Sequence, residues 1–151
     1  MAGEALGEAL GEALGEALGE ALTVLIVADD LMWSTRLLSQ AARAGASGRA
    51  VRDVAALRAA IAESSPDLVV VDLSGRSFDG VAVVAEAANA GLTVIAIAQH
   101  EEHEVRKRAL AAGARRVYAN AKMHADGIAL LRRWLAREEG ALAVSREGAE
   151  R

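Results

Sequence analysis

The feature that most constrains the fold of this chain is a regular alternation, from Thr23 onward, of short branched apolar runs with longer segments of helical spacing. The runs predict strands over 23–28, 49–51, 68–72, 93–98 and 116–119, and the segments predict helices over 31–45, 54–65, 80–91, 101–113 and 125–139. Nearly continuous apolar strands are typical of parallel sheets that are buried on both faces. The sequence therefore predicts an α/β fold with a five-stranded parallel sheet and helices on both faces.

The N-terminal segment departs from this pattern, because Met1 and Ala2 are followed by five perfect copies of Gly-Glu-Ala-Leu. A four-residue repeat drifts by about 40° per copy around a helix, and each glycine costs about 1 kcal/mol relative to alanine. We therefore expect a disordered or weakly helical low-complexity extension over 1–22, with an interaction helix as the alternative. One domain over 23–139 and a flexible tail over 140–151 complete the expected organisation.

The net charge of −4 is unevenly distributed. The extension holds five of the 21 acidic residues and no basic residue, so the remaining chain has 16 acidic and 17 basic residues and a net charge of +1. A nearly neutral body gives no support for nucleic-acid binding. The absence of cysteine excludes disulfides and thiolate metal sites, and no segment predicts a signal peptide or a membrane span. We expect a cytoplasmic protein with no membrane partner.

Three carboxylates follow the first and third predicted strands: Asp29, Asp30 and Asp72. In parallel α/β sheets, ligands bind at the carboxyl ends of strands, near the point where the strand order reverses. Clustered carboxylates suit a hard divalent cation such as Mg²⁺, beside which an aspartate can attack a phosphoryl group. The alternative is that these aspartates are ordinary polar residues at strand ends, where aspartate often caps a helix.

A resemblance to a known family bears on this choice. The stretch PDLVVVDLSGRSFDG (66–80) resembles the third strand and following loop of the receiver domains of bacterial response regulators, the CheY-like superfamily. VLIVADD (24–30) resembles that family's first strand and acidic turn, and AGARRVYAN (112–120) resembles the stretch leading through its fifth strand. The resemblance covers 23–138 and implies a flavodoxin-like fold and a role in two-component signalling.

The resemblance also implies roles for individual residues. Asp72 falls on the phospho-acceptor aspartate. Of the two acids that hold the family's Mg²⁺ cofactor beside that aspartate, one falls on Asp29, and the other is lost unless Asp30 substitutes for it. Arg76, in the loop after Asp72, takes a position where proline is common. Lys122 is a candidate phosphate contact if the fifth strand extends far enough to carry it.

Four positions depart from the family's pattern: Ala28, Ala98, Val117 and Asn120. They replace, in this order, one of the two acids after the first strand, the hydroxyl residue of the fourth strand, the switch aromatic and the lysine. Tyr118 is adjacent to the aromatic position. Because a switch needs two states that its ligand binds unequally, these changes remove most of the residues that would couple phosphorylation to a distal surface.

The resemblance and its departures together indicate an atypical, degenerate receiver, or pseudo-receiver. We expect a signalling module that docks onto a protein partner, either a histidine kinase or a downstream regulator, and that is not an enzyme. A homodimer through the last two helices is a further expectation. The alternative is a working phospho-receiver that accepts a phosphoryl group on Asp72 from a histidine kinase with Mg²⁺, with slow self-dephosphorylation as its only catalysis. A small α/β metalloenzyme would need a second catalytic group, which the sequence does not offer.

Two further groups of residues have simpler interpretations. His100 and His103, with Glu104 beside them, could contribute to a zinc site, but three ligands are not evident and a solvated helix terminus is expected. Trp134 is expected in the core or at an interface. Burial of Trp134 in the monomer would argue against the interface.

Overall fold

The computed structural model describes the backbone of residues 22–149 and the side chains through residue 136. The strands are β1 (Thr23–Val27), β2 (Ser47–Val51), β3 (Leu68–Asp72), β4 (Val94–Ala98) and β5 (Arg116–Ala119). The helices are α2 (Leu31–Arg43), α3 (Val54–Glu63), α4 (Gly80–Asn89), α5 (His103–Ala112) and α6 (Asn120–Ala149). All strands are parallel, in the order β2-β1-β3-β4-β5, which confirms the predicted flavodoxin-like fold.

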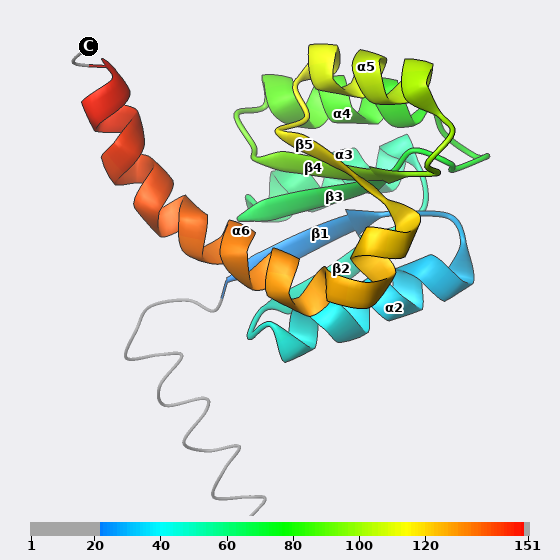
Figure 1. Ribbon diagram of the computed structural model, residues 1–151, viewed down its shortest axis with the longest axis horizontal. Coiled ribbons are helices and arrows are strands. Elements are labelled where there is room, and N and C mark those ends of the chain that lie inside the picture. The colour runs from blue at the N-terminus through cyan, green and yellow to red at the C-terminus, as the bar shows by residue number, and fades with distance from the viewer. Residues whose placement is uncertain (1–21, 150–151) are drawn as a thin grey trace, which may run out of the picture.

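The helices cover the sheet in two layers, with α2 and α6 on one face and α3, α4 and α5 on the other (Figure 1). Alternate residues of each strand supply the two cores. In β3, for example, Leu68 and Val70 pack toward α2 and α6, while Val69 and Val71 pack toward the other three helices. This period of two follows from the pleat of a strand, and the burial of both faces explains why β1 after Thr23, β3 before Asp72 and the whole of β4 are apolar.

The largest difference from the predicted elements concerns α6. This helix begins at Asn120, directly after β5, and its backbone continues to Ala149. The segment 140–149 is therefore helical where a flexible tail was expected, because it lacks proline and is rich in good helix formers. Residues 1–21 of the extension predicted over 1–22 lie outside the described residues. No helix in the described part of the chain is long and apolar enough to cross a membrane.

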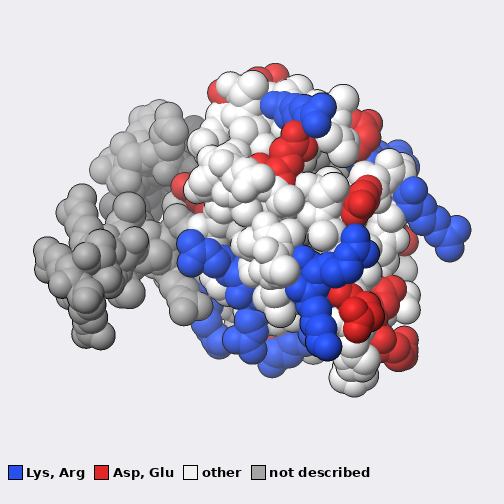
Figure 2. Space-filling model, turned by 90° about the horizontal axis from the view of Figure 1, so that it is seen from above, with Lys and Arg blue, Asp and Glu red and all other residues white. Residues whose placement is uncertain are grey.

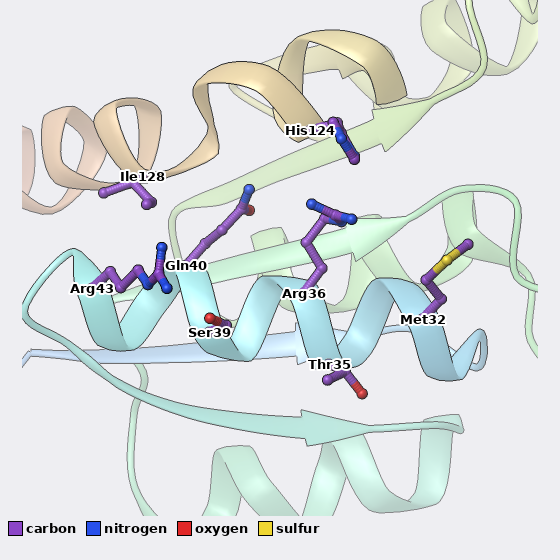
Figure 3. A pocket seen from close by; sticks show the side chains of 8 residues that line it. All are labelled: Met32, Thr35, Arg36, Ser39, Gln40, Arg43, His124 and Ile128. Carbon is purple, nitrogen blue, oxygen red and sulfur yellow. The ribbon is translucent and has the colours of Figure 1, made fainter.

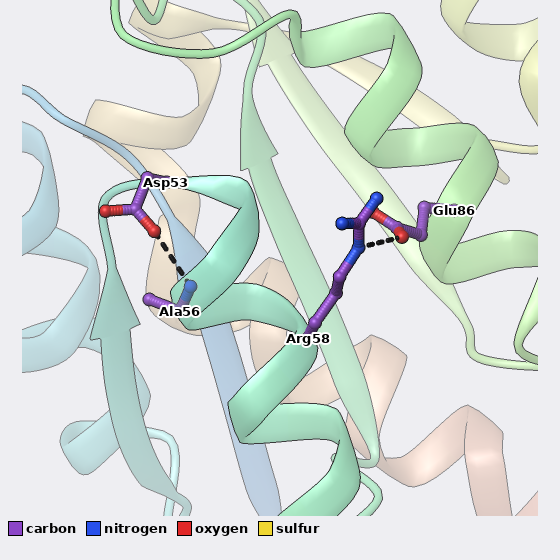
Figure 4. Close-up of polar contacts among 4 residues, drawn as sticks. All are labelled: Asp53, Ala56, Arg58 and Glu86. Carbon is purple, nitrogen blue, oxygen red and sulfur yellow. Dashed lines mark hydrogen bonds and ion pairs between the residues drawn. The ribbon is translucent and has the colours of Figure 1, made fainter.

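Polar contacts fix the ends and the spacing of the helices on the second face. Asp53 caps α3 by accepting a hydrogen bond from the Ala56 N–H at 2.8 Å, and Arg58 of α3 pairs with Glu86 of α4 at 2.6 Å (Figure 4). Exposed pairs of this kind contribute at most about 1 kcal/mol. The surface seen from above in Figure 2 mixes acidic, basic and uncharged side chains, and several basic side chains lie next to one another along the lower left of this view.

On the first face, α6 approaches α2 closely. A Cβ atom at Gly127 would lie 2.3 Å from the side chain of Gln40, whose Nε2 donates to the Met123 carbonyl at 3.0 Å. Further along α6, Trp134 is 7% exposed, and its indole N–H donates to the Tyr118 hydroxyl at 2.7 Å. The interface hypothesis for Trp134 was therefore wrong, because this side chain belongs to the core.

Candidate functional site

The candidate site surrounds Asp72, the last residue of β3, at the carboxyl edge of the sheet. All five residues of β3 are buried, and Asp72 is 2% exposed. Asp72 pairs with Ile97 of β4, and the N–H of the next residue, Leu73, donates to the Ile97 carbonyl at 2.9 Å. The strand is thus held in register to its end, which fixes the carboxylate between the ends of β1 and β4.

The electrostatic surroundings of Asp72 disfavour its charged form. The N–H of Ser74 donates to its Oδ1 at 3.0 Å. Burial raises the pKa of Asp72, the Ser74 hydrogen bond opposes only part of this effect, and the negative charges of Asp29, Asp30 and Glu102 raise the pKa further. Glu102 was not predicted; it lies in the loop after β4, and no motif in the sequence pointed to it. The carboxylates near Asp72 therefore make this edge of the sheet electronegative.

The Asp29 carboxylate is held by the loop between β3 and α4. Its Oδ2 accepts hydrogen bonds from the N–H groups of Arg76 and Ser77, each at 2.7 Å, and from the Ser77 hydroxyl at 2.8 Å. The Ser77 N–H has the largest effect and lowers the pKa of Asp29, although partial burial opposes it. Proline, which is common in the resembled family at position 76, has no N–H and could not make the first of these bonds.

Asp30 has the role of a helix cap. Its Oδ1 accepts a hydrogen bond from the Trp33 N–H at 2.9 Å, which satisfies one of the free donors at the start of α2. The side chain is exposed. Asp30 therefore contributes negative charge near Asp72 while its carboxylate is engaged with α2, as the simpler interpretation of the sequence expected.

The predicted carboxylate cluster is not assembled as a metal site. Among the residues that the structure describes, no three Asp, Glu, Cys or His side chains are brought together in a way that could hold a metal ion. The same finding covers His100 and His103, whose ring centroids lie 6.4 Å apart. Carboxylate oxygens suit Mg²⁺ chemically, but the Oδ2 atom of Asp29 already accepts three hydrogen bonds. In this arrangement the residues do not fit a site that requires Asp29, Asp30 and Asp72 together.

Of the predicted departures, Ala98 is the last residue of β4, as expected, whereas Ala28 directly follows β1, and its N–H donates to the Val51 carbonyl at 3.1 Å. Both residues are fully buried, and Ala98 pairs with Ala119 of β5 at the carboxyl edge. A methyl side chain at either position offers no hydroxyl or carboxylate to a bound group. The two neighbouring strand ends therefore supply apolar walls beside Asp72 in place of polar ligands.

Val117 and Tyr118 point to opposite faces of β5. Val117 is packed in the core beneath α3, α4 and α5, whereas Tyr118 is packed in the core beneath α2 and α6. The hydroxyl of Tyr118 is bonded to Trp134. Because adjacent residues of a strand face opposite sides, Tyr118 does not replace the missing aromatic at position 117.

Lys122 does not lie on an extended fifth strand, because β5 ends at Ala119. The lysine is exposed in the first turn of α6, where its Nζ pairs with Asp126 at 2.7 Å. The condition under which Lys122 was expected to contact phosphate is therefore not met. Asn120 follows β5 directly, and its buried Oδ1 has no hydrogen-bond partner among the described residues. An amide at this point cannot supply the positive charge of a lysine.

Comparisons with known proteins agree with the architecture. No protein-family model matches the chain, and no curated protein does either. Among solved structures, NtrX from Brucella abortus matches with a TM-score of 0.75 and 24% identity over 83% of this chain, which spans 29% of that NtrX chain. The receiver domain of NtrX alone matches with a TM-score of 0.68 and 24% identity, covering 75% of this chain and 98% of the domain.

A second solved structure is the CheY-like response regulator receiver domain protein from Methanospirillum hungatei JF-1. It matches with a TM-score of 0.72 and 18% identity, covering 81% of this chain and 99% of that chain. The receiver domain of TorR, a response regulator of the TMAO respiratory system, has a TM-score of 0.70 and 19% identity over 77% of this chain and 98% of that domain. At these identities the likeness establishes a receiver-type fold.

Proposed function

We propose that the chain is a receiver-like module of two-component signalling that acts in the cytoplasm by docking onto a protein partner, with a degenerate phosphorylation site. The observation that carries this proposal is the engagement of the Asp29 carboxylate by Arg76 and Ser77. The donors come from the chain's own loop and all bond to Oδ2, so they occupy one oxygen of the carboxylate that would otherwise face a cation. The apolar residues at Ala98 and Val117 support the same conclusion, because they offer no hydroxyl and no mobile aromatic to sense a phosphoryl group.

The proposal makes the protein a binding module and not an enzyme. Asp72 is the only acidic side chain buried at the carboxyl edge within the described residues, and the structure places no general acid or base in hydrogen-bond contact with it. The partner is a histidine kinase or a downstream regulator of the same signalling class. The nearly neutral body supports a protein partner over nucleic acid.

Intact-mass spectrometry after incubation with acetyl phosphate and Mg²⁺ tests the proposal. A receiver domain with a complete acidic site should be treated in parallel, to show that the reagent transfers phosphate. We expect no adduct on this chain, with an intact fold by circular dichroism. A phosphate adduct that is absent from Asp72→Asn would instead support the alternative, a working phospho-receiver.

The proposed homodimer is tested separately by light scattering over a range of concentrations. With Trp134 in the core, the exposed large apolar residue on the last two helices is Leu110 of α5, at 49% exposure within the described side chains. Association that weakens on Leu110→Gln would support a dimer through this face. A monomer mass that does not change with concentration would exclude the dimer.

A further inference from the structure

A groove between α2 and α6 lies on the opposite side of the sheet from α3, α4 and α5 and plays no part in the site around Asp72. Its volume is about 480 Å³. In Figure 3, Arg36 and Gln40 extend from α2 toward α6, and His124 points from α6 into the space between them. Met32 and Ile128 add apolar surface to the lining, and Met32 is 68% exposed. The groove thus combines apolar surface with basic groups.

The charged side chains that line the groove are all positive. Arg36 and Arg43 line it, and no acidic residue does. The whole of α2 contains no acidic residue, and neither arginine forms an ion pair with a described residue. The guanidinium of Arg132, on α6, donates to the Arg43 carbonyl at 3.0 Å and brings a third positive charge to the same end of the groove. A ligand for this surface should be acidic and should carry apolar side chains.

The chain contains such a segment outside the described residues. Residues 1–21 carry five glutamates and no lysine or arginine, and each glutamate is followed two residues later by a leucine. The stretch 77–105 also holds five acidic residues and no lysine or arginine, but it belongs to the folded body, where it forms α4, β4 and the start of α5. The composition of residues 1–21 is therefore complementary to the groove in both charge and apolar content.

The connection to the described body brings the segment to the correct end of the groove. Leu22 packs against the core beneath α2 and α6, as does Ala44, the residue that follows Arg43. The carbonyl of Leu22 accepts a hydrogen bond from the Ser47 N–H at 2.8 Å. The groove follows α2 back from Arg43 to Met32, about 16 Å along a helix at 1.5 Å per residue. A segment of this length exceeds that distance even when helical, at about 30 Å.

We propose that the acidic segment 1–21 docks in the α2–α6 groove of its own chain, with its glutamates facing Arg36 and Arg43 and its leucines against Met32 and Ile128. The short connection gives the segment a high effective concentration at the groove. A partner that binds this face must first displace the segment. The proposal does not depend on whether Asp72 accepts a phosphoryl group.

The absence of cysteine makes a direct test simple. Ala9→Cys in the full chain introduces a single thiol in the acidic segment, to which a nitroxide spin label can be attached. Paramagnetic broadening of backbone amide signals in the ¹⁵N-labelled protein then reports where the label lies. We expect broadening along Arg36–Arg43 of α2 and around His124 and Ile128 of α6, and none on α4 or α5.

Two variants of the labelled protein test the role of charge. Replacing the five glutamates of the segment by glutamine leaves the folded body unchanged and should reduce the broadening to the level of the diamagnetic reference. The double reversal Arg36→Glu and Arg43→Glu should do the same. The matched control is Arg108→Glu with Arg115→Glu, two exposed arginines on the side of α5, which should leave the broadening unchanged.

Salt and mixing experiments complete the test. Raising the ionic strength from about 0.01 M to about 1 M shortens the Debye length from about 30 Å to about 3 Å, and should release the segment. Broadening that persists in the glutamine variant would overturn the proposal, because charge would not direct the contact. The proposal would also be overturned if the same broadening were seen in a mixture of spin-labelled ¹⁴N chains and unlabelled ¹⁵N chains, because the occupant of the groove would then be a second copy. Broadening confined to surfaces other than the groove would also overturn it.

Discussion

Replacing Asp29 by asparagine should destabilise the protein at neutral pH through the loss of charge-assisted hydrogen bonds. Hydrogen bonds to a charged group contribute about 1.5–3 kcal/mol and neutral ones about 0.5–1.5 kcal/mol, so each bond loses roughly 1 kcal/mol. The Arg76 and Ser77 N–H groups account for two bonds at 2.7 Å. The Ser77 hydroxyl also lies 3.0 Å from the Arg52 carbonyl and can donate there instead. Since Asp29 is partly exposed and water can replace part of the loss, we expect a decrease of about 1–2 kcal/mol.

The pH dependence of this decrease identifies its cause. The folded-state pKa of Asp29 lies below its ordinary value of 3.8. The charged carboxylate therefore contributes stability that is fully present above the unfolded-state pKa and is lost as the pH falls through the folded-state pKa. Urea unfolding followed by circular dichroism, at neutral pH and at successively lower pH, should show the wild type and Asp29→Asn converging in acid.

The neighbouring Asp30 provides the control. It makes a single cap hydrogen bond to the Trp33 N–H, and asparagine caps a helix about as well as aspartate. Asp30→Asn should therefore leave the stability nearly unchanged at every pH. Our interpretation of the loop contact would be refuted if Asp29→Asn had no effect at neutral pH, or if its effect were the same at low pH.

Three further substitutions have clear expected outcomes in the same urea assay. Asp72→Asn should raise the stability at neutral pH, on the order of 1 kcal/mol. The folded-state pKa of Asp72 is raised, so the free-energy cost of burying its charge is present above that pKa and vanishes in acid. An effect of the substitution that does not depend on pH would contradict the burial argument. Gly113→Ala should lower the stability by about 1–3 kcal/mol, since φ of Gly113 is +121° and the new Cβ would lie 2.5 Å from the Cβ of Ala88. An unchanged stability would contradict this close packing. Tyr118→Phe should cost about 1 kcal/mol through the lost hydrogen bond to Trp134, and a double-mutant cycle with Trp134→Phe that shows no coupling would exclude that bond.

The fold was predictable because its signals are local. The run LVVVD ends on an aspartate after four buried apolar residues, and β3 has the predicted bounds of Leu68 and Asp72. The start of α6 was predicted five residues too late, at 125, whereas the helix begins at Asn120. In the structure Gly127 lies inside the helix, where it allows the close approach of Gln40. That requirement is a tertiary contact between residues 87 positions apart, which no local pattern reveals.

The site was predictable only in part for a similar reason. Strand ends identified Asp29 and Asp72, but the hydrogen-bond partners of Asp29 lie 47 and 48 positions away. Those contacts depend on the path of the loop after β3. The contribution of Glu102 to the charge around Asp72 likewise depends on the loop after β4. The role of Lys122 rested on the length of β5, and strand ends are difficult to predict to within two residues.

The central claim is that the loop after β3, and not a cation, holds Asp29. It can be tested directly by titrating the ¹⁵N-labelled protein with Mg²⁺ and following the amide signals of Arg76 and Ser77. The hydrogen bonds to the Asp29 carboxylate should hold these signals in place, so we expect no saturable shift at either amide. A saturable shift at both amides that is abolished by Asp29→Asn would show that the carboxylate leaves the loop for the cation, and would contradict the account.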